Sequence, residues 1–149
     1  MCYPLIIYSM RGLKDFGDGT YQAARAIGPV IVIRPDKRDD AGLLAHELEH
    51  VKQFAVLAVI ACALIALVWV HVGTVAGVPS WSVFPLGLGL HASLYGLVPE
   101  YRLWAEVEAY QVQAGYYADD RLPLFARFIS EHYDLPITQA SALQLLREK

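Results

Sequence analysis

The clearest pattern in this 149-residue chain is a long tract without charge that separates two charged parts. The 47 residues of Gln53–Pro99 contain no Asp, Glu, Lys or Arg. The 17 residues of Phe54–Val70 are all apolar, and the 18 residues of Trp81–Val98 form a second apolar stretch. A helix over residues 54–78 would be about 37 Å long, which exceeds the roughly 30 Å hydrocarbon core of a bilayer. The pattern therefore predicts a hairpin of two transmembrane helices over residues 54–98.

The flanks of this hairpin indicate its orientation. The turn at Gly77–Ser80 carries no charge, so it is the part expected to be translocated across the membrane. Basic residues near both open ends favour the cytoplasmic side, and these are Lys37, Arg38, Lys52 and Arg102. Inside the tract, His71 and His91 each need a polar partner, which could be the other histidine or a backbone carbonyl.

Two alternatives to the hairpin stay open. The two apolar segments could instead be core helices of a soluble protein. The second segment contains proline and glycine, so it could also enter the bilayer without spanning it.

Shorter patterns on either side of the tract predict an α+β fold that is mostly helical. Leu5–Ser9 and the β-branched run Val30–Ile33 favour strands. A helical spacing of apolar residues begins at Gly42, and either Asp39 or Asp40 can cap that helix. Three later segments are expected to be helices: Arg102–Gln113, Leu124–His132 and Thr138–Arg147.

Charge and cysteine content narrow the possible partners. The net charge is -3, and no basic stripe is present to neutralise phosphates, so nucleic acid is not an expected partner. The two cysteines, Cys2 and Cys62, do not form a disulfide framework, which suits a reducing compartment. We therefore expect the charged parts of the chain to lie in the cytoplasm.

The segment directly before the apolar tract carries the most specific chemistry. His46–His50 reads His-Glu-Leu-Glu-His, and two imidazoles four residues apart lie one above the other on a helix. Such a pair can bind one zinc ion, and the carboxylate of Glu47 can act as general base. Zinc lowers the pKa of its bound water towards about 7, so Glu47 could take a proton from that water and pass it to the leaving amine.

A catalytic zinc site needs a third protein ligand and an open position for water. The acidic helix after the tract offers Glu106 and Glu108. Glu106 shares a helix face with Ala109 and Tyr110, and the small Ala109 allows that face to approach the motif helix closely. Glu108 points about 200° away from Glu106, so the facing argument favours Glu106 as the ligand.

Three further features have open alternatives. Tyr110 could hydrogen-bond a zinc ligand or the developing oxyanion, or it could be a packed aromatic residue with a satisfied hydroxyl. Gln53 lies seven residues after His46, on the same face, and could support the zinc ligands or mark the membrane boundary. The strand at Val30–Arg34 could pair with an extended substrate as an edge strand, or it could be a buried strand that only packs.

These residues resemble the small gluzincins, also called minigluzincins, which are bacterial and phage-associated zinc peptidases. The resemblance rests on His46–Gln53, on Tyr101–Tyr110 and on the preceding strand at Ile31–Pro35. It implies a single zincin-like domain over residues 1–149, with a small sheet, an active-site helix and the hairpin as an insertion. It also implies a zinc site in which Glu47 is the catalytic base and the ligands are His46, His50 and Glu106.

The layout is also similar to that of the membrane gluzincins of the HtpX kind. In those proteins transmembrane helices lie between the His-Glu-x-x-His motif and the third-ligand glutamate, which belongs to a Glu-x-x-Ala-Asp pattern. In this chain Tyr110 occupies the position of that Asp.

The residues and the resemblance together predict a minimal membrane-embedded zinc metallopeptidase, in which Glu47 activates a zinc-bound water to hydrolyse peptide bonds. His50 precedes Phe54 by four residues, about 6 Å along a helix, so the metal would lie near the lipid surface. The expected partners are the bilayer and a peptide or membrane-protein substrate. The expected location is a membrane, the bacterial inner membrane by analogy, with the site on its cytoplasmic face.

Two rival functions are consistent with the same residues. One is a non-catalytic membrane protein with a structural or regulatory zinc site. The other is a soluble peptidase whose apolar hairpin is buried against a partner or within an oligomer.

Overall fold

The computed structural model describes residues 4–15, 22–76 and 84–148, with the backbone alone for 71–76 and 84–87. Across these ranges the chain forms three short strands, five α-helices and one turn of 3-10 helix, η1 (Pro35–Lys37). The fold is therefore α+β and mostly helical, as the residue patterns predict.

The sheet contains β1 (Leu5–Tyr8), β2 (Ala24–Ile27) and β3 (Val30–Ile33), in the order β1-β3-β2. β3 pairs in parallel with β1 and antiparallel with β2. The β2–β3 connection is tight and uses Gly28 at φ +57°, a backbone conformation that glycine adopts without strain.

The sheet corrects one expectation. β3 lies in the middle of the sheet, so the interpretation of Val30–Arg34 as an edge strand is wrong. Its residues Ile31–Ile33 are buried, and they pack as the alternative interpretation predicts. The edge strands are instead β1 and β2, and the sequence did not predict β2 because Ala-Arg-Ala-Ile lacks a β-branched run.

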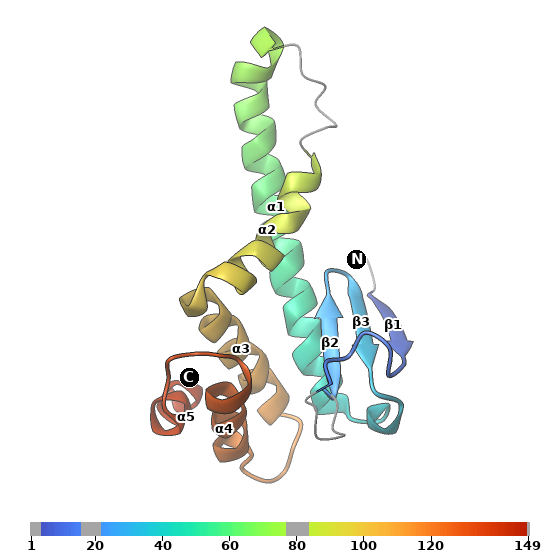
Figure 1. Ribbon diagram of the computed structural model, residues 1–149, viewed down its shortest axis with the longest axis vertical. Helices are drawn as coiled ribbons and strands as arrows, with labels where there is room; N and C mark the ends of the chain where they lie inside the picture. Colours follow the sequence, from blue (N-terminus) through green and yellow to red (C-terminus); the bar gives the residue numbers. More distant parts are fainter. Residues whose placement is uncertain (1–3, 16–21, 77–83, 149) are drawn as a thin grey trace.

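A single long helix, α1 (Ala41–Ala76), organises the molecule (Figure 1). It has 36 residues and is about 54 Å long. Of the two predicted caps, Asp40 is the one used, because its Oδ1 accepts a hydrogen bond of 2.9 Å from the backbone N–H of Leu43. The sheet packs on the first turns of α1, and its core contains Ala24, Ile31 and Ile33 with Leu43, Leu44 and Val51 around them.

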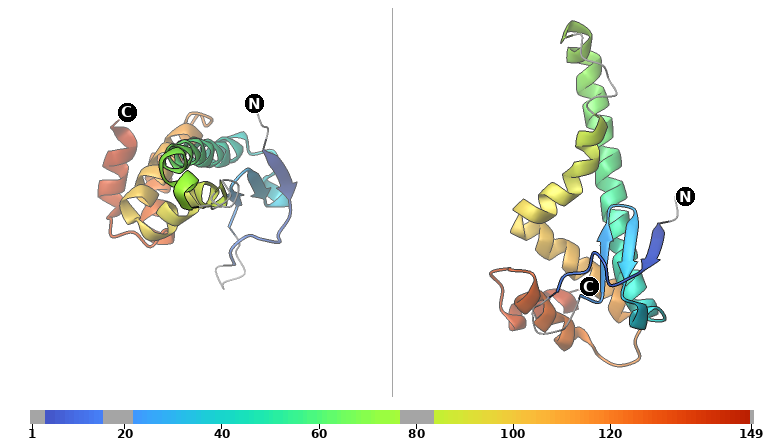
Figure 2. Two further views of the ribbon diagram at one scale, coloured as in Figure 1. Left: turned by 90° about the horizontal axis from the view of Figure 1, so that it is seen from above. Right: turned by 45° about the vertical axis from the view of Figure 1, so that its right-hand side comes forward.

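Four further helices complete the fold: α2 (Phe84–Leu97), α3 (Pro99–Ala114), α4 (Leu122–His132) and α5 (Gln139–Arg147). α2 lies against the middle of α1, and α3 returns along its lower part (Figure 1). The two views of Figure 2 show the sheet on one side of α1, and α4 and α5 on the other. α4 and α5 pack on α3 around Phe125, Ile129 and Leu146.

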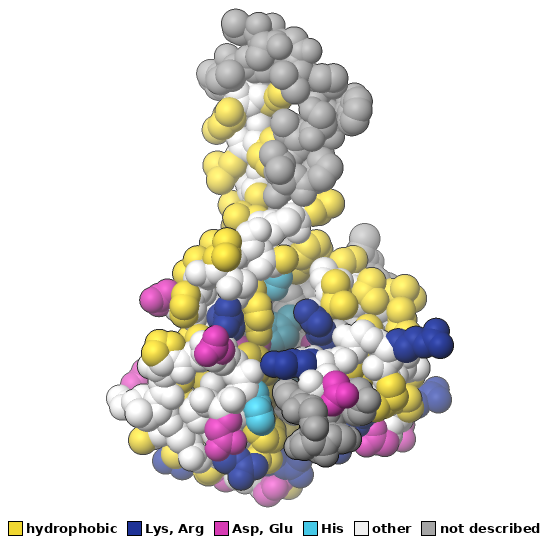
Figure 3. All heavy atoms as spheres, in the orientation of Figure 1, with side chains coloured by type: hydrophobic (Ala, Val, Ile, Leu, Met, Phe, Trp, Pro, Cys, Tyr) yellow, Lys and Arg dark blue, Asp and Glu magenta, His cyan; other side chains and the backbone are white. Residues whose placement is uncertain are grey.

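The upper part of α1 projects from the rest of the molecule (Figure 1), and exposed apolar side chains lie along its coloured portion in Figure 3. The segment Ala41–Val70 is long and apolar enough to cross a membrane, and only 17% of its most apolar window is buried. A core helix of a soluble protein would be mostly buried, so the low burial argues against that alternative.

The second apolar stretch differs from the prediction of a spanning helix. Its helix, α2, has 14 residues, and a length of about 21 Å is too short for the hydrocarbon core. The described residues therefore contain one candidate span instead of two. The predicted turn at Gly77–Ser80 and the side chain of His71 lie outside the described part of the chain.

Candidate metal centre

The three predicted metal ligands meet between α1 and α3. One ligand atom each from His46, His50 and Glu106 lie within 4.8 Å of one another, so the group could hold a metal ion. Glu106 is 1% exposed and His46 is 4% exposed. Ala105 and Ala109 are fully buried on the same face of α3, which confirms that small residues let the two helices approach. Glu108, the alternative ligand, is not part of the group.

The distances between the ligand atoms fit one tetrahedral ion. The Nε2 atoms of His46 and His50 are 3.2 Å apart. Nε2 of His46 lies 3.5 Å from Oε2 of Glu106, and Nε2 of His50 lies 3.3 Å from Oε1 of the same carboxylate. Ligands about 2.0–2.1 Å from a tetrahedral zinc ion are separated by about 3.4 Å. The separation of the two nitrogens, and that of each nitrogen from its nearer carboxylate oxygen, are close to this value.

One oxygen of Glu106 is available to such an ion. Oε1 accepts a hydrogen bond from the hydroxyl of Tyr95. Oε2 is buried and has no hydrogen-bond partner among the described residues. Burial by itself would raise the pKa of Glu106, but the neighbouring His50 and His46 rings hold it below its usual range. A buried carboxylate that stays ionised, with one oxygen unpaired, fits a cation well.

Gln53 orients the ring of His50. Its amide nitrogen donates to the backbone carbonyl of Ala105 at 3.2 Å, and its Oε1 lies 3.0 Å from Nδ1 of His50. An amide oxygen can only accept, so Nδ1 of His50 carries a proton, and Nε2 is the nitrogen that faces the other ligands. Gln53 therefore supports a predicted zinc ligand, and it joins α1 to α3 at the same time.

Glu47 lies on the sheet side of the site. Its side chain is 5% exposed, and burial raises the pKa of Glu47, whereas the nearby His46 and His50 rings and the backbone of Ala26 in β2 favour its charged form. Antiparallel pairing of Arg25 with Val32 and of Ile27 with Val30 directs the groups of Ala26 away from β3. The general base predicted from the sequence thus lies beside the edge of β2 that has no strand partner among the described residues.

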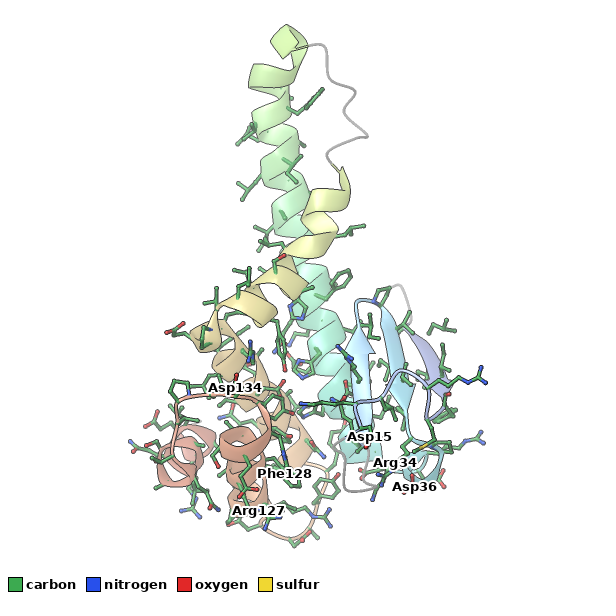
Figure 4. The ribbon with its side chains drawn as sticks, viewed as in Figure 1. Asp15, Arg34, Asp36, Arg127, Phe128 and Asp134 are labelled. Atoms are coloured by element: carbon green, nitrogen blue, oxygen red, sulfur yellow. The ribbon has the colours of Figure 1, made fainter. Side chains whose placement is uncertain are left out.

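Two adjoining hollows meet at these residues. A cleft of about 990 Å³ includes His46, Glu47 and His50 in its wall, and it extends towards α2 at Leu88 and His91. Asp134, labelled in Figure 4, lines it from the connection between α4 and α5. A second hollow of about 420 Å³ shares His46 and Glu47 and is lined by α4. β2 borders both hollows, so its edge runs past Glu47.

Tyr110 is in contact with the site through its ring. The ring packs edge-on against His46 at 4.4 Å between centroids and stacks on Phe125 at 4.8 Å. Its hydroxyl lies 3.0 Å from that of Tyr133, and burial raises the pKa of Tyr110, so it stays protonated. This arrangement agrees with the packed-aromatic alternative. A role for Tyr110 at the oxyanion remains a prediction.

Sequence reasoning missed two tyrosines at the site, Tyr95 and Tyr133. Tyr95 lies inside the charge-free tract, where a hydroxyl needs a polar partner, and that requirement was the only local signal. Tyr133 lies in an irregular segment, and no pattern identified it. His91, whose partner was left open, lies 2.7 Å from the hydroxyl of Tyr101 through its Nδ1.

The geometry has to be interpreted without the help of relatives. Comparison with models of protein families, with curated proteins and with solved structures finds no match to this chain.

Proposed function

We propose that this protein is a zinc-dependent metallopeptidase anchored in a membrane by the apolar part of α1. The observation that carries the proposal is the convergence of His46, His50 and Glu106 at separations near 3.4 Å, with Glu47 beside them. Two imidazoles and one carboxylate are a ligand set that suits zinc. Zinc bound there would supply a Lewis acid that activates water and polarises the scissile carbonyl.

The residues around the metal divide the remaining work. Glu47 accepts a proton as water attacks the carbonyl carbon, and it delivers that proton to the nitrogen of the leaving amine when the peptide bond breaks. Burial and the neighbouring backbone of Ala26 restrict the position of the Glu47 carboxylate. Gln53 keeps the ring of His50 in the tautomer that can ligate.

The free edge of β2 is the proposed binding place for the substrate backbone. Ala24 and Ala26 alternate with the residues that pair with β3, so their carbonyl groups face the cleft side. An extended peptide can add to such an edge as a further strand. It would then pass from the α2 side of the cleft to the α4 side, with its scissile bond beside Glu47.

The membrane part of the proposal rests on the exposed apolar half of α1. The helix is long enough to span, and α2 serves as a shorter second arm that enters the bilayer without crossing it. Basic residues flank both arms, so the metal site is assigned to the cytoplasmic face. A site this close to the bilayer favours membrane proteins or membrane-bound peptides as substrates.

The rival function, a structural zinc site, has weaker support. Structural zinc sites are closed by four protein ligands, whereas catalytic sites use three and keep one position open. Within the described ranges the candidate group has three members, and a buried glutamate that is not one of them lies beside it.

The test compares the purified full chain in detergent with its Glu47→Gln variant. We expect both proteins to contain one zinc per chain, and only the wild type to cleave a library of peptides. Loss of the general base should lower cleavage by about 10²–10⁴-fold. Wild-type protein that binds zinc but cleaves no peptide would favour the structural site, and protein that binds no metal would refute the proposal.

A further inference from the structure

The hydroxyl of Tyr95 makes a contact that the proposed chemistry does not use. Tyr95 belongs to α2, the short apolar helix, whereas the three candidate ligands belong to α1 and α3. Its hydroxyl donates a hydrogen bond to Oε1 of Glu106, and its ring lies edge-on to His50 at 6.1 Å between centroids. A third helix therefore reaches the metal centre through one side chain.

We infer that Tyr95 is a positioning residue for Glu106, which makes α2 a working part of the metal centre as well as an apolar arm. The terminal torsion of a glutamate is broad, so burial alone does not fix the plane of the carboxylate. A hydrogen bond to Oε1 fixes that plane, with Oε1 3.3 Å from Nε2 of His50 and Oε2 3.5 Å from Nε2 of His46. Tyr95 therefore sets the orientation in which the carboxylate of Glu106 is presented to the ion.

Arg102 holds the turn that carries Tyr95. Its guanidinium donates to the backbone carbonyls of Tyr95 and Gly96, each at 2.8 Å, and to that of Tyr133, also at 2.8 Å. The last carbonyls of a helix have no partner within the helix, and here one cation binds two of them. Arg102 lies one turn before Glu106 on α3, so the guanidinium that holds the end of α2 and the candidate ligand share one helix face.

α2 also packs against α1, one turn before Tyr95. His91, one turn before Tyr95, packs edge-on against Phe54 at 6.2 Å between centroids. Phe54 lies one turn after His50 on the same helix. α2 is thus held between the helix that carries the two imidazoles and the helix that carries the carboxylate, and Tyr95 lies where all three meet.

The inference rests on the metal binding within the proposed function and is independent of peptide cleavage. The test uses the full chain in detergent as wild type, as Tyr95→Phe and as Tyr101→Phe. Tyr101→Phe is the matched control, because it also removes one hydroxyl that is bonded to a histidine, and that histidine, His91, is not a candidate ligand. Zinc affinity is measured by competition with a chromophoric chelator, and the ligand field by the absorption of the Co²⁺-loaded protein.

We expect Tyr95→Phe to bind zinc about 10–100-fold more weakly and to shift the Co²⁺ absorption bands, because partners of metal ligands have effects of this size. Tyr101→Phe should stay within about 2-fold of the wild type and keep the wild-type spectrum. If Tyr95→Phe binds zinc with the affinity and the Co²⁺ spectrum of the wild type, this inference is overturned and the proposed function is not. Equal losses in both variants, with equally lowered thermal midpoints, would also overturn it. Wild type that binds no metal would overturn it together with the proposed function.

Discussion

The two halves of α1 differ in the side chains that they bury and expose. In the half that ends at Gln53, the polar residues His46, Glu47 and Gln53 are each no more than 5% exposed. In the half that follows, seven large apolar residues are between 48% and 69% exposed: Val56, Val59, Ile60, Leu64, Leu67, Val68 and Val70. One continuous helix therefore buries polar side chains up to Gln53 and exposes apolar side chains after it.

The difference shows that the two halves are suited to different surroundings. Buried polar groups are costly without partners, and the first half lies against α3, where the carbonyl of Ala105 accepts a hydrogen bond from Gln53. Exposed apolar groups in such number are unfavourable in water but not in hydrocarbon. Helical backbone satisfies its own hydrogen bonds in both surroundings, so the helix continues without a break across the boundary.

The largest expected effect concerns the metal centre that the first half of α1 forms with α3. Glu106→Gln keeps the volume of the buried ligand and removes its charge, whereas Glu108→Gln makes the same change two residues away on α3. We expect Glu106→Gln to weaken zinc binding by more than about 100-fold. Loss of a metal ligand should weaken binding more than loss of a residue that only hydrogen-bonds a ligand. Chelator competition on detergent-purified protein measures both variants.

Glu108→Gln should bind zinc as the wild type does. If the two variants bind equally well, the buried polar groups of the first half do not converge on a metal, and the contrast with the second half needs another cause.

A second pair of variants introduces one charged residue into each half of α1. Leu64, in the apolar half, is 57% exposed, and Leu48, in the first half, is 39% exposed. Arginine at the centre of a spanning helix costs about 2.5–3.5 kcal/mol, so Leu64→Arg should shift the ratio of integrated to extractable protein on the order of 100-fold. Alkaline extraction of membranes, followed by quantification of both fractions, measures this ratio.

Leu48→Arg should change that ratio little, because an exposed surface substitution costs within about 0.5 kcal/mol. Wild-type protein that is extracted in aqueous buffer without detergent, with Leu64→Arg indistinguishable from it, would support a soluble protein whose apolar surface is covered by a partner.

The smallest expected effect is at the start of the first half. Tyr117 donates a hydrogen bond of 2.6 Å to Oδ1 of Asp40, the same oxygen that caps α1. Tyr117→Phe should lower the free energy of unfolding by about 1 kcal/mol, and the thermal midpoint by about 2–4 °C, without changing zinc affinity. Differential scanning fluorimetry measures the midpoint, and Tyr116→Phe, at a residue 59% exposed, is the control. A large loss of zinc would mean that this contact supports the site as well as the helix start.

Local patterns were sufficient for the parts of the site that belong to one helix. The four-residue spacing places His46 and His50 together on any helix, and the charge-free tract identifies the apolar half of α1. The facing argument on α3 also placed Glu106 with the two histidines, because Ala109 marks the close-packed side in the sequence itself.

Contacts between elements could not be derived in this way. The edge position of β2 depends on strand order, and the contact of Tyr95 with Glu106 depends on how the chain turns at Val98, which is extended between α2 and α3. The short length of α2 also could not be deduced from the apolar stretch around it. Helical periodicity relates residues one turn apart and so can be read along the chain. Pairing of strands and docking of helices depend on the packing of distant segments, which only the folded chain determines.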